Sequence, residues 1–173
     1  MKKLFFLLLI GVFSLSNLKA QEKADEVLAK AFSQAKKEHK KVLLIFHASW
    51  CGWCKKMDKN MQVPEVAPYF SKNFVTTHLT VMEMPAKKSL ENPGADEILK
   101  KYGGSEDQGI PFFVIINPKN EQMEENSLNE KKENLGCPSS PEEVDSFIKK
   151  LQKITKLAKD DEKNIREVFT AKK

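Results

Sequence analysis

The chain has 173 residues, of which 40% are hydrophobic and 31% are charged. This length allows one domain with a hydrophobic core of its own, and we see no repeat and no second domain. The formal net charge is +5, but the first twenty residues contain three lysines and no acidic residue. The remainder carries 26 basic and 24 acidic residues, a net charge of +2, so the basic balance is no evidence for nucleic acid as a partner.

The first twenty residues have the pattern of an export signal. Lys2 and Lys3 precede an apolar run at 4–13 and a polar segment that ends at a small residue, Ala20. An uncleaved membrane anchor is the alternative, although the apolar run is short for a full span. We therefore predict a signal peptide at 1–20, one domain over 21–173, and an exported, periplasmic protein.

Helical and extended patterns alternate through the first half of the remaining chain. The apolar face of residues 22–40 predicts a helix. The run 41–48 is apolar at consecutive positions, which predicts a strand buried on both faces of a sheet. A second helix is predicted from Gly52 to Met61, and β-favouring residues predict a second strand at 74–82.

The second half of the chain is more varied. A short helix is predicted to end at Gly103, and a buried strand is predicted at 112–116. Residues 121–135 are charged and form at best a polar edge strand. Ser140, Pro141 and Glu143 predict a capped helix start. The helical pattern weakens after Ala158, with one further apolar patch formed by Ile165, Val168 and Phe169.

The most informative stretch is Trp50-Cys51-Gly52-Trp53-Cys54, where the first strand gives way to a helix. Unpaired backbone N–H groups and the positive end of the helix dipole stabilise an anion at a helix start. Cys51 should therefore have a lowered pKa and act as the nucleophile, with Lys55 and Lys56 adding positive potential. Cys54 can attack the resulting mixed disulfide from within the same turn.

The same spacing is also compatible with two other kinds of site. A zinc site would need two further ligands, and the remaining cysteine and histidines do not have the spacing of a zinc knuckle. These residues are Cys137, His39, His47 and His78. A purely structural disulfide is disfavoured because so short a loop gains little stability from a cross-link. We predict no metal and no cofactor.

These features together resemble the thioredoxin family. The order of elements agrees, and the combination of Trp-Cys-x-x-Cys with a later Ile-Pro is far more specific than either motif alone. Smaller matches occur in the same order over residues 25–155: Asn92-Pro93-Gly94, Tyr102-Gly103, Gly109-Ile110-Pro111 and Leu135-Gly136. The resemblance implies an α/β thioredoxin-like fold, with a central mixed sheet of four to five strands flanked by helices.

The resemblance also implies roles for individual residues. Cys51 would be the attacking cysteine and Cys54 the cysteine that resolves the mixed disulfide, and the two would form the redox-active disulfide. Pro111 would be a cis proline that faces the disulfide and presents the backbone of Ile110 to an extended substrate. The implied substrate-binding residues are Trp50, Gly52, Trp53, Ile110 and Pro111.

The sequence departs from the family pattern at several positions. The family's common Gly-Pro between the cysteines is Gly-Trp here, so the redox potential does not carry over. Ile45 occupies the place of a buried acid that serves proton transfer to the second cysteine. Water or His78 would have to replace that acid, unless His78 is an ordinary histidine. Cys137 is either a free, partly buried thiol or a third redox position.

The leading interpretation is an exported thiol–disulfide oxidoreductase. It would exchange disulfides with protein substrates and with a redox partner whose identity the sequence does not reveal. A thioredoxin-fold binding module without turnover is the alternative from another class, but such a module has no need of a solvent-facing cysteine pair. A disulfide isomerase is the third reading, although isomerases usually need a second domain or a dimer. The predicted state is a monomer that binds neither nucleic acid nor metal.

Overall fold

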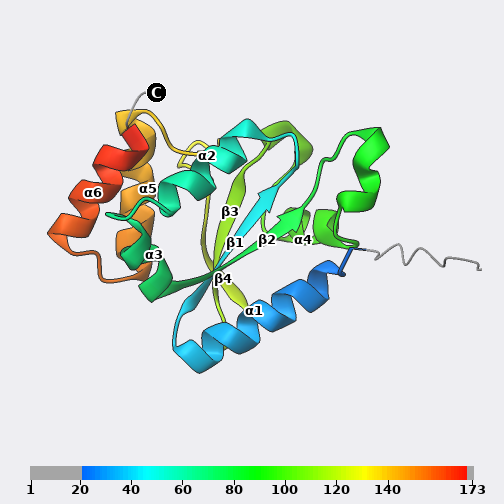
Figure 1. Cartoon of the computed structure of the whole chain (residues 1–173), viewed down its shortest axis with the longest axis horizontal. Helices are drawn as coiled ribbons and strands as arrows, with labels where there is room; N and C mark the ends of the chain where they lie inside the picture. The colour runs from blue at the N-terminus through cyan, green and yellow to red at the C-terminus, as the bar shows by residue number, and fades with distance from the viewer. Residues whose placement is uncertain (1–20, 171–173) are drawn as a thin grey trace, which may run out of the picture.

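A mixed sheet with the strand order β2-β1-β3-β4 forms the centre of the fold (Figure 1). This computed structural model describes residues 21–170. The strands are β1 (Lys41–His47), β2 (Phe74–Thr80), β3 (Phe112–Asn117) and β4 (Gln122–Asn126). β1 pairs in parallel with β2 and antiparallel with β3, and β3 pairs antiparallel with β4. The predicted thioredoxin-like mixed sheet is confirmed.

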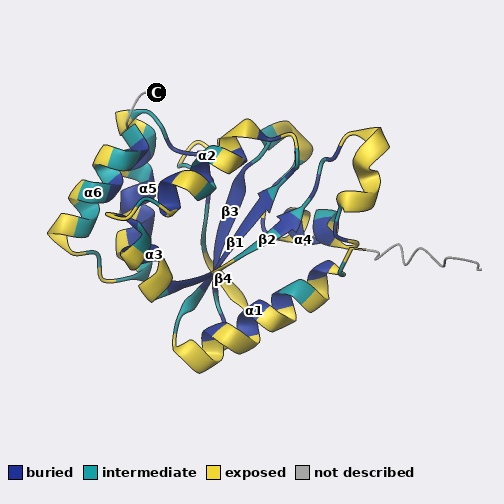
Figure 2. Ribbon diagram, in the orientation of Figure 1, coloured by how far each residue is buried: buried dark blue, intermediate teal, exposed yellow. Residues whose placement is uncertain are grey.

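Helices cover both faces of this sheet. They are α1 (Ala24–Glu38), α2 (Gly52–Met61), α3 (Ala67–Asn73), α4 (Ala95–Lys101), α5 (Pro141–Ile154) and α6 (Lys159–Thr170), with short 3-10 turns η1 (Pro85–Leu90) and η2 (Glu106–Gln108). Side chains alternate along a strand, so Leu44 and Phe46 of β1 pack with α1 and α4, whereas Leu43 and Ile45 pack with α2, α3, α5 and α6. Figure 2 shows the central strands buried and the outer helix faces exposed.

The final two helices extend the core beyond the sheet. Ser140 caps α5 and Glu143 closes the predicted capping box, with its carboxylate accepting from the Ser140 N–H at 3.0 Å. The chain then turns back into α6, a charged helix that the sequence indicates only as an apolar patch. Ile165 and Phe169 lie one helical turn apart and are fully buried, so α6 is part of the second core.

β4 is the polar edge strand expected within residues 121–135. η1 and the residues around it form the green projection beyond β2 in Figure 1. The predicted signal peptide, residues 1–20, lies outside the described part of the chain. Within residues 21–170, none of the helices has the length and apolar character needed to cross a bilayer.

Candidate active site

The turn from β1 into α2 carries the cysteine pair. Cys51 is the N-cap of α2, and its Sγ accepts a hydrogen bond from the Cys54 backbone N–H at 3.1 Å. The two sulfur atoms form a disulfide with a Cα–Cα distance of 5.3 Å. The first turn of α2 contains no acidic residue. When the pair is reduced, this backbone donor and the helix dipole both favour a thiolate on Cys51.

The disulfide is more covered than the sequence led us to expect. Cys51 is 3% exposed and Cys54 is 2% exposed, so the pair does not face solvent openly. Both cysteines pack against Ala48 and Ile110 in a small apolar cluster. The neighbouring Trp50 and Trp53 are about half exposed. The residues that cover the pair therefore limit the access of a second sulfur atom to it.

A loop after β2 fixes the position of the cysteine turn. The indole Nε1 of Trp50 donates to the carbonyl oxygen of Met82 at 2.7 Å. The buried carboxylate of Glu83 accepts from both the backbone N–H and the hydroxyl of Ser49. Sequence reasoning missed Glu83, although an acidic residue directly after an apolar strand was a detectable signal.

The Ile110–Pro111 bond is cis, as the resemblance implies. The Ile110 carbonyl oxygen lies 3.7 Å from Cys51 Sγ, so the proline loop borders the disulfide directly. Beside it lies a hollow that we call the proline groove, about 230 Å³ in volume. The groove is lined by Trp53, Gln108, Gly109, Ile110, Pro111, Asn134, Leu135, Gly136, Cys137, Ser139 and Glu143.

The structure thus brings together three of the five predicted substrate-binding residues. Trp53, Ile110 and Pro111 line the proline groove, whereas Trp50 and Gly52 are exposed outside its lining. Substrate contact by these five residues stays a prediction. Lys56 lies over the Trp53 ring, with Nζ 4.9 Å from the ring centroid, which places a positive charge near the groove.

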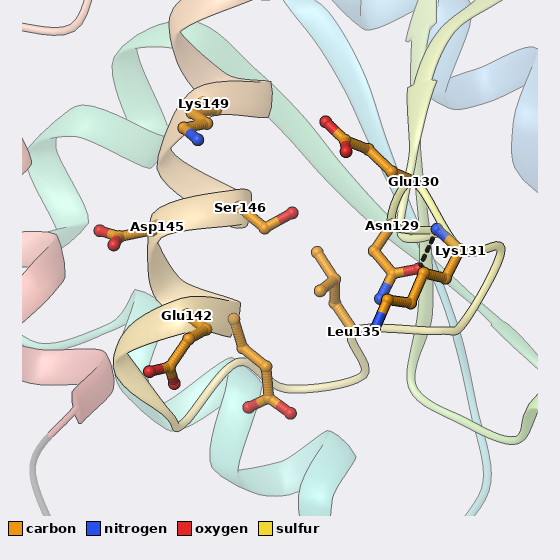
Figure 3. A pocket seen from close by; sticks show the side chains of 9 residues that line it. Asn129, Glu130, Lys131, Leu135, Glu142, Asp145, Ser146 and Lys149 are labelled. Carbon is orange, nitrogen blue, oxygen red and sulfur yellow. Dashed lines mark hydrogen bonds between the residues drawn. The ribbon is translucent and has the colours of Figure 1, made fainter.

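A wider hollow of about 450 Å³ lies between α5 and the loop at 129–135 (Figure 3). Asp145, Ser146 and Lys149 from α5 line one side, and Asn129 and the neighbouring loop residues line the other. Its lining includes neither cysteine of the disulfide nor the Ile110–Pro111 pair. Size alone is therefore a poor guide to the reactive surface of this protein.

Ile45 and His78 lie side by side on β1 and β2, where the family has a buried acid on the first of these strands. Ile45 is fully buried in the apolar core below α2, as its type requires. His78 pairs with Ile45 across the sheet and faces α2, where its Nε2 lies 2.9 Å from Asp58 Oδ1. The ring of His47 lies 4.9 Å from that of His78. Burial lowers the pKa of His47, and the adjacent His78 lowers it further.

Asp58 also lies near Cys54 in the sequence of α2. It is one helical turn after Cys54, on the same helix. A carboxylate, Asp58 of α2, and two imidazoles, His78 and His47, thus lie together where the family has a single buried acid. Proton transfer through His78 stays a prediction.

Cys137 is a free, buried thiol at the edge of the proline groove. Burial raises its pKa to about 11, and the negative charges of Glu143 and Asp58 act in the same direction against the opposing effect of Lys56. A thiol with this pKa is protonated at neutral pH and is a poor nucleophile. The structure therefore favours the reading of Cys137 as a packed thiol over that of a third redox position.

We expect Cys137 in the folded protein to react with iodoacetamide at about pH 8 roughly a hundredfold more slowly than in the denatured chain, because its raised pKa reduces the thiolate population. The rate should rise with pH until it passes about pH 11, where the thiol ionises. Mass spectrometry of timed samples measures this rate. Equal rates in the folded and denatured protein would show that the Cys137 thiol is not buried and that folding does not raise its pKa.

Among residues 21–170, no group of three or more histidine, cysteine, aspartate or glutamate side chains is arranged to hold a metal ion.

Comparison with known proteins agrees with this geometry. The fold and a cysteine pair at a helix start define the class of thiol–disulfide oxidoreductases. The family described as Thioredoxin-like matches residues 23–118, which is more than half of the sequence. The chain belongs to this thioredoxin-like family. A comparison with curated proteins found no match.

Solved structures with a similar fold come from several bacteria. A disulphide isomerase from Xylella fastidiosa Temecula1 has a TM-score of 0.51 and 20% identity, covering 89% of this chain and 91% of that chain. The DsbD C-terminal domain from Neisseria meningitidis in the oxidised form has a TM-score of 0.48 and 23% identity, covering 79% and 100%. A thioredoxin from Thermus thermophilus has a TM-score of 0.47 and 20% identity, covering 78% and 85%.

Proposed function

We propose that this protein is an exported thiol–disulfide oxidoreductase that exchanges disulfides with protein substrates, with Cys51 as the attacking residue and Cys54 as the resolving residue. The observation that carries the proposal is the disulfide at the start of α2, where the Cys54 N–H donates to Cys51 Sγ. A structural cross-link would not require the sulfur atom of Cys51 to sit at a helix N-terminus beside a groove.

The reaction consists of two exchange steps. In the reduced enzyme, the Cys51 thiolate attacks one sulfur atom of a substrate disulfide, forms a mixed disulfide and releases the other substrate sulfur as a thiolate. Cys54 then loses its proton and attacks the Cys51 sulfur, which breaks the mixed disulfide and releases the second substrate thiol. Two electrons pass to the substrate, and the enzyme is left with the Cys51–Cys54 disulfide. The reverse sequence oxidises a substrate dithiol.

Protein substrates suit the surface around Cys51. The proline groove is lined in part by Ile110 and Pro111, and the carbonyl oxygen of Ile110 lies next to the Cys51 sulfur. An extended polypeptide can form backbone hydrogen bonds with such an edge, as an added strand does. The exposed indoles of Trp50 and Trp53 provide apolar area for contact with a partner.

The proposal of export rests on the charged, apolar and polar segments of residues 1–20. An oxidising compartment beyond the membrane would also keep the cysteine pair in the disulfide state unless a reductant acts on it. We further propose that residues 21–170 act as one domain, because α5 and α6 share a core with the sheet.

Selective alkylation of the two cysteines tests the assignment of their roles. After reduction, Cys51 should react with iodoacetamide faster than Cys54 at about pH 6, because only Cys51 has the helix N-terminus and the Cys54 N–H to stabilise its thiolate. Brief labelling followed by mass spectrometry of the peptides gives the two rates. Preferential labelling of Cys54 would reverse the assignment of the attacking and resolving residues.

A further inference from the structure

Asn134 connects the two loops that form the proline groove. Its Nδ2 donates to the carbonyl oxygens of Gln108, Gly109 and Pro111 at 3.2, 3.0 and 3.0 Å. Its Oδ1 accepts from the backbone N–H of Gly136 at 3.0 Å. One amide side chain therefore holds both walls of the groove.

The chemistry of these partners determines the orientation of the amide. Carbonyl oxygens only accept hydrogen bonds and a backbone N–H only donates, so the nitrogen must face the proline loop and the oxygen must face Gly136. With two N–H donors for three carbonyl oxygens, at least one donor is shared. Neither alanine nor aspartate can reproduce this set of contacts.

The residues held in this way are the ones next to the reactive disulfide. Gly109 and Pro111 are the two neighbours of Ile110, whose carbonyl oxygen lies 3.7 Å from Cys51 Sγ. Gly136 is followed by Cys137 on the opposite wall of the groove. Gly109 and Gly136 have φ values of 71° and 58°. Glycine adopts positive φ without steric cost because it has no Cβ atom, but it also has more backbone freedom than other residues. The contacts of Asn134 therefore help to fix the backbone at both glycines.

We propose that Asn134 is a positioning residue that sets the width of the proline groove for an extended polypeptide, and that it thereby gives the enzyme its preference for polypeptide over small disulfides. The inference rests on the proposed exchange with protein substrates. Asn134 has no direct part in the exchange, because it contacts the loops rather than the sulfur atoms. Its loss leaves Cys51 at its helix start and leaves the longer hydrogen bond from Gln108 Nε2 to the Lys132 carbonyl oxygen, 3.4 Å, as the remaining side-chain link, so the two walls can move relative to each other.

The test compares a polypeptide disulfide, insulin, with a small one, dithiobis-nitrobenzoate, as oxidants of the reduced enzyme. In Asn134→Ala, the ratio of the insulin rate constant to the small-disulfide rate constant should fall roughly tenfold or more, since a displacement of about 1 Å strongly affects a positioned reaction. The fall should appear mainly as a raised KM for insulin. Asn134→Asp should lower the ratio at least as much, because a carboxylate oxygen would face three carbonyl oxygens.

Asn126→Ala is the matched control. Asn126 also bridges two segments, donating to the Tyr102 carbonyl oxygen at 3.1 Å and accepting from the Leu128 N–H at 3.0 Å, but it does not line the groove. Its rate ratio should equal that of the wild-type protein. If Asn134→Ala does not fold, Asn134→Ser decides the matter, because its hydroxyl keeps one donor but cannot reproduce all four contacts of the amide.

The possible failures are distinguishable. A wild-type protein that exchanges with insulin, together with Asn134 variants whose ratio is unchanged, would overturn the role of Asn134 and leave the proposed function intact. A fall of the ratio in Asn126→Ala equal to that in Asn134→Ala would also overturn it, because general loosening would then explain both. A wild-type protein that reacts with the small disulfide but not with insulin would overturn the polypeptide substrate itself.

Discussion

Replacing Cys54 with serine is expected to convert the protein into a trap for its substrates. Cys51 keeps its place as N-cap of α2 and still attacks a substrate disulfide, but a serine hydroxyl cannot attack the mixed disulfide that forms. Turnover should fall by about a thousandfold or more, because the removed step has no substitute of similar reactivity. Covalent complexes should accumulate and should disappear when a reductant is added.

Non-reducing electrophoresis followed by mass spectrometry measures these complexes. The matched control is the double variant Cys51→Ser with Cys54→Ser, which should form none. Adding Cys137→Ser to Cys54→Ser should leave the complexes in place, because a thiol with a pKa of about 11 is not the attacking group. Complexes that require Cys137, or none at all from folded Cys54→Ser, would contradict the mechanism and favour a binding module without turnover.

Replacing Phe169 with alanine should destabilise the protein by about 3–5 kcal/mol. Phe169 is fully buried, and its ring lies 5.3 Å from Phe147 of α5 and 6.5 Å from Phe70 of α3. Its removal leaves a cavity that the surrounding aromatic rings can fill only in part. The free energy of unfolding, from urea denaturation followed by circular dichroism, gives the effect.

Phe169→Leu keeps a large apolar side chain and is the control; it removes less volume than alanine does and should lose only about 1 kcal/mol. The large effect of the alanine variant would show that α6 belongs to the same cooperative unit as the sheet, although the family match ends at residue 118. A loss below about 1 kcal/mol in Phe169→Ala would contradict a shared core and the single domain proposed here.

The parts of the fold that follow from local chemistry could be predicted. α2 begins at Gly52 and ends at Met61 as expected, and Ser140 forms the predicted capping box with Glu143. These features depend on residues within a few positions of each other, so the sequence displays their pattern directly. The resemblance to the thioredoxin family added the cis bond before Pro111 and the mixed sheet.

The contacts that shape the site depend on residues far apart in the sequence, and these could not be predicted. Asn134 bonds to residues 23 to 26 positions earlier, and Glu83 binds Ser49 across 34 positions. Asparagine and glutamate in polar loops give no periodic signal, so Asn134 looks like a solvated residue and the place of Glu83 directly after a strand does not identify Ser49 as its partner. The near-complete burial of the cysteines has the same origin, because Ala48 and Ile110 meet around the disulfide only in the folded chain.

Equilibration of the purified protein with glutathione redox buffers tests the central claim most directly. The dithiol and disulfide forms of Cys51 and Cys54 are trapped by alkylation and counted by mass spectrometry across a range of buffer potentials. The account predicts a reversible two-electron transition confined to this pair while the protein stays folded. Cys137 should form no disulfide with glutathione at any buffer potential. A pair that remains oxidised until the protein unfolds would identify a structural disulfide and contradict the proposed oxidoreductase activity.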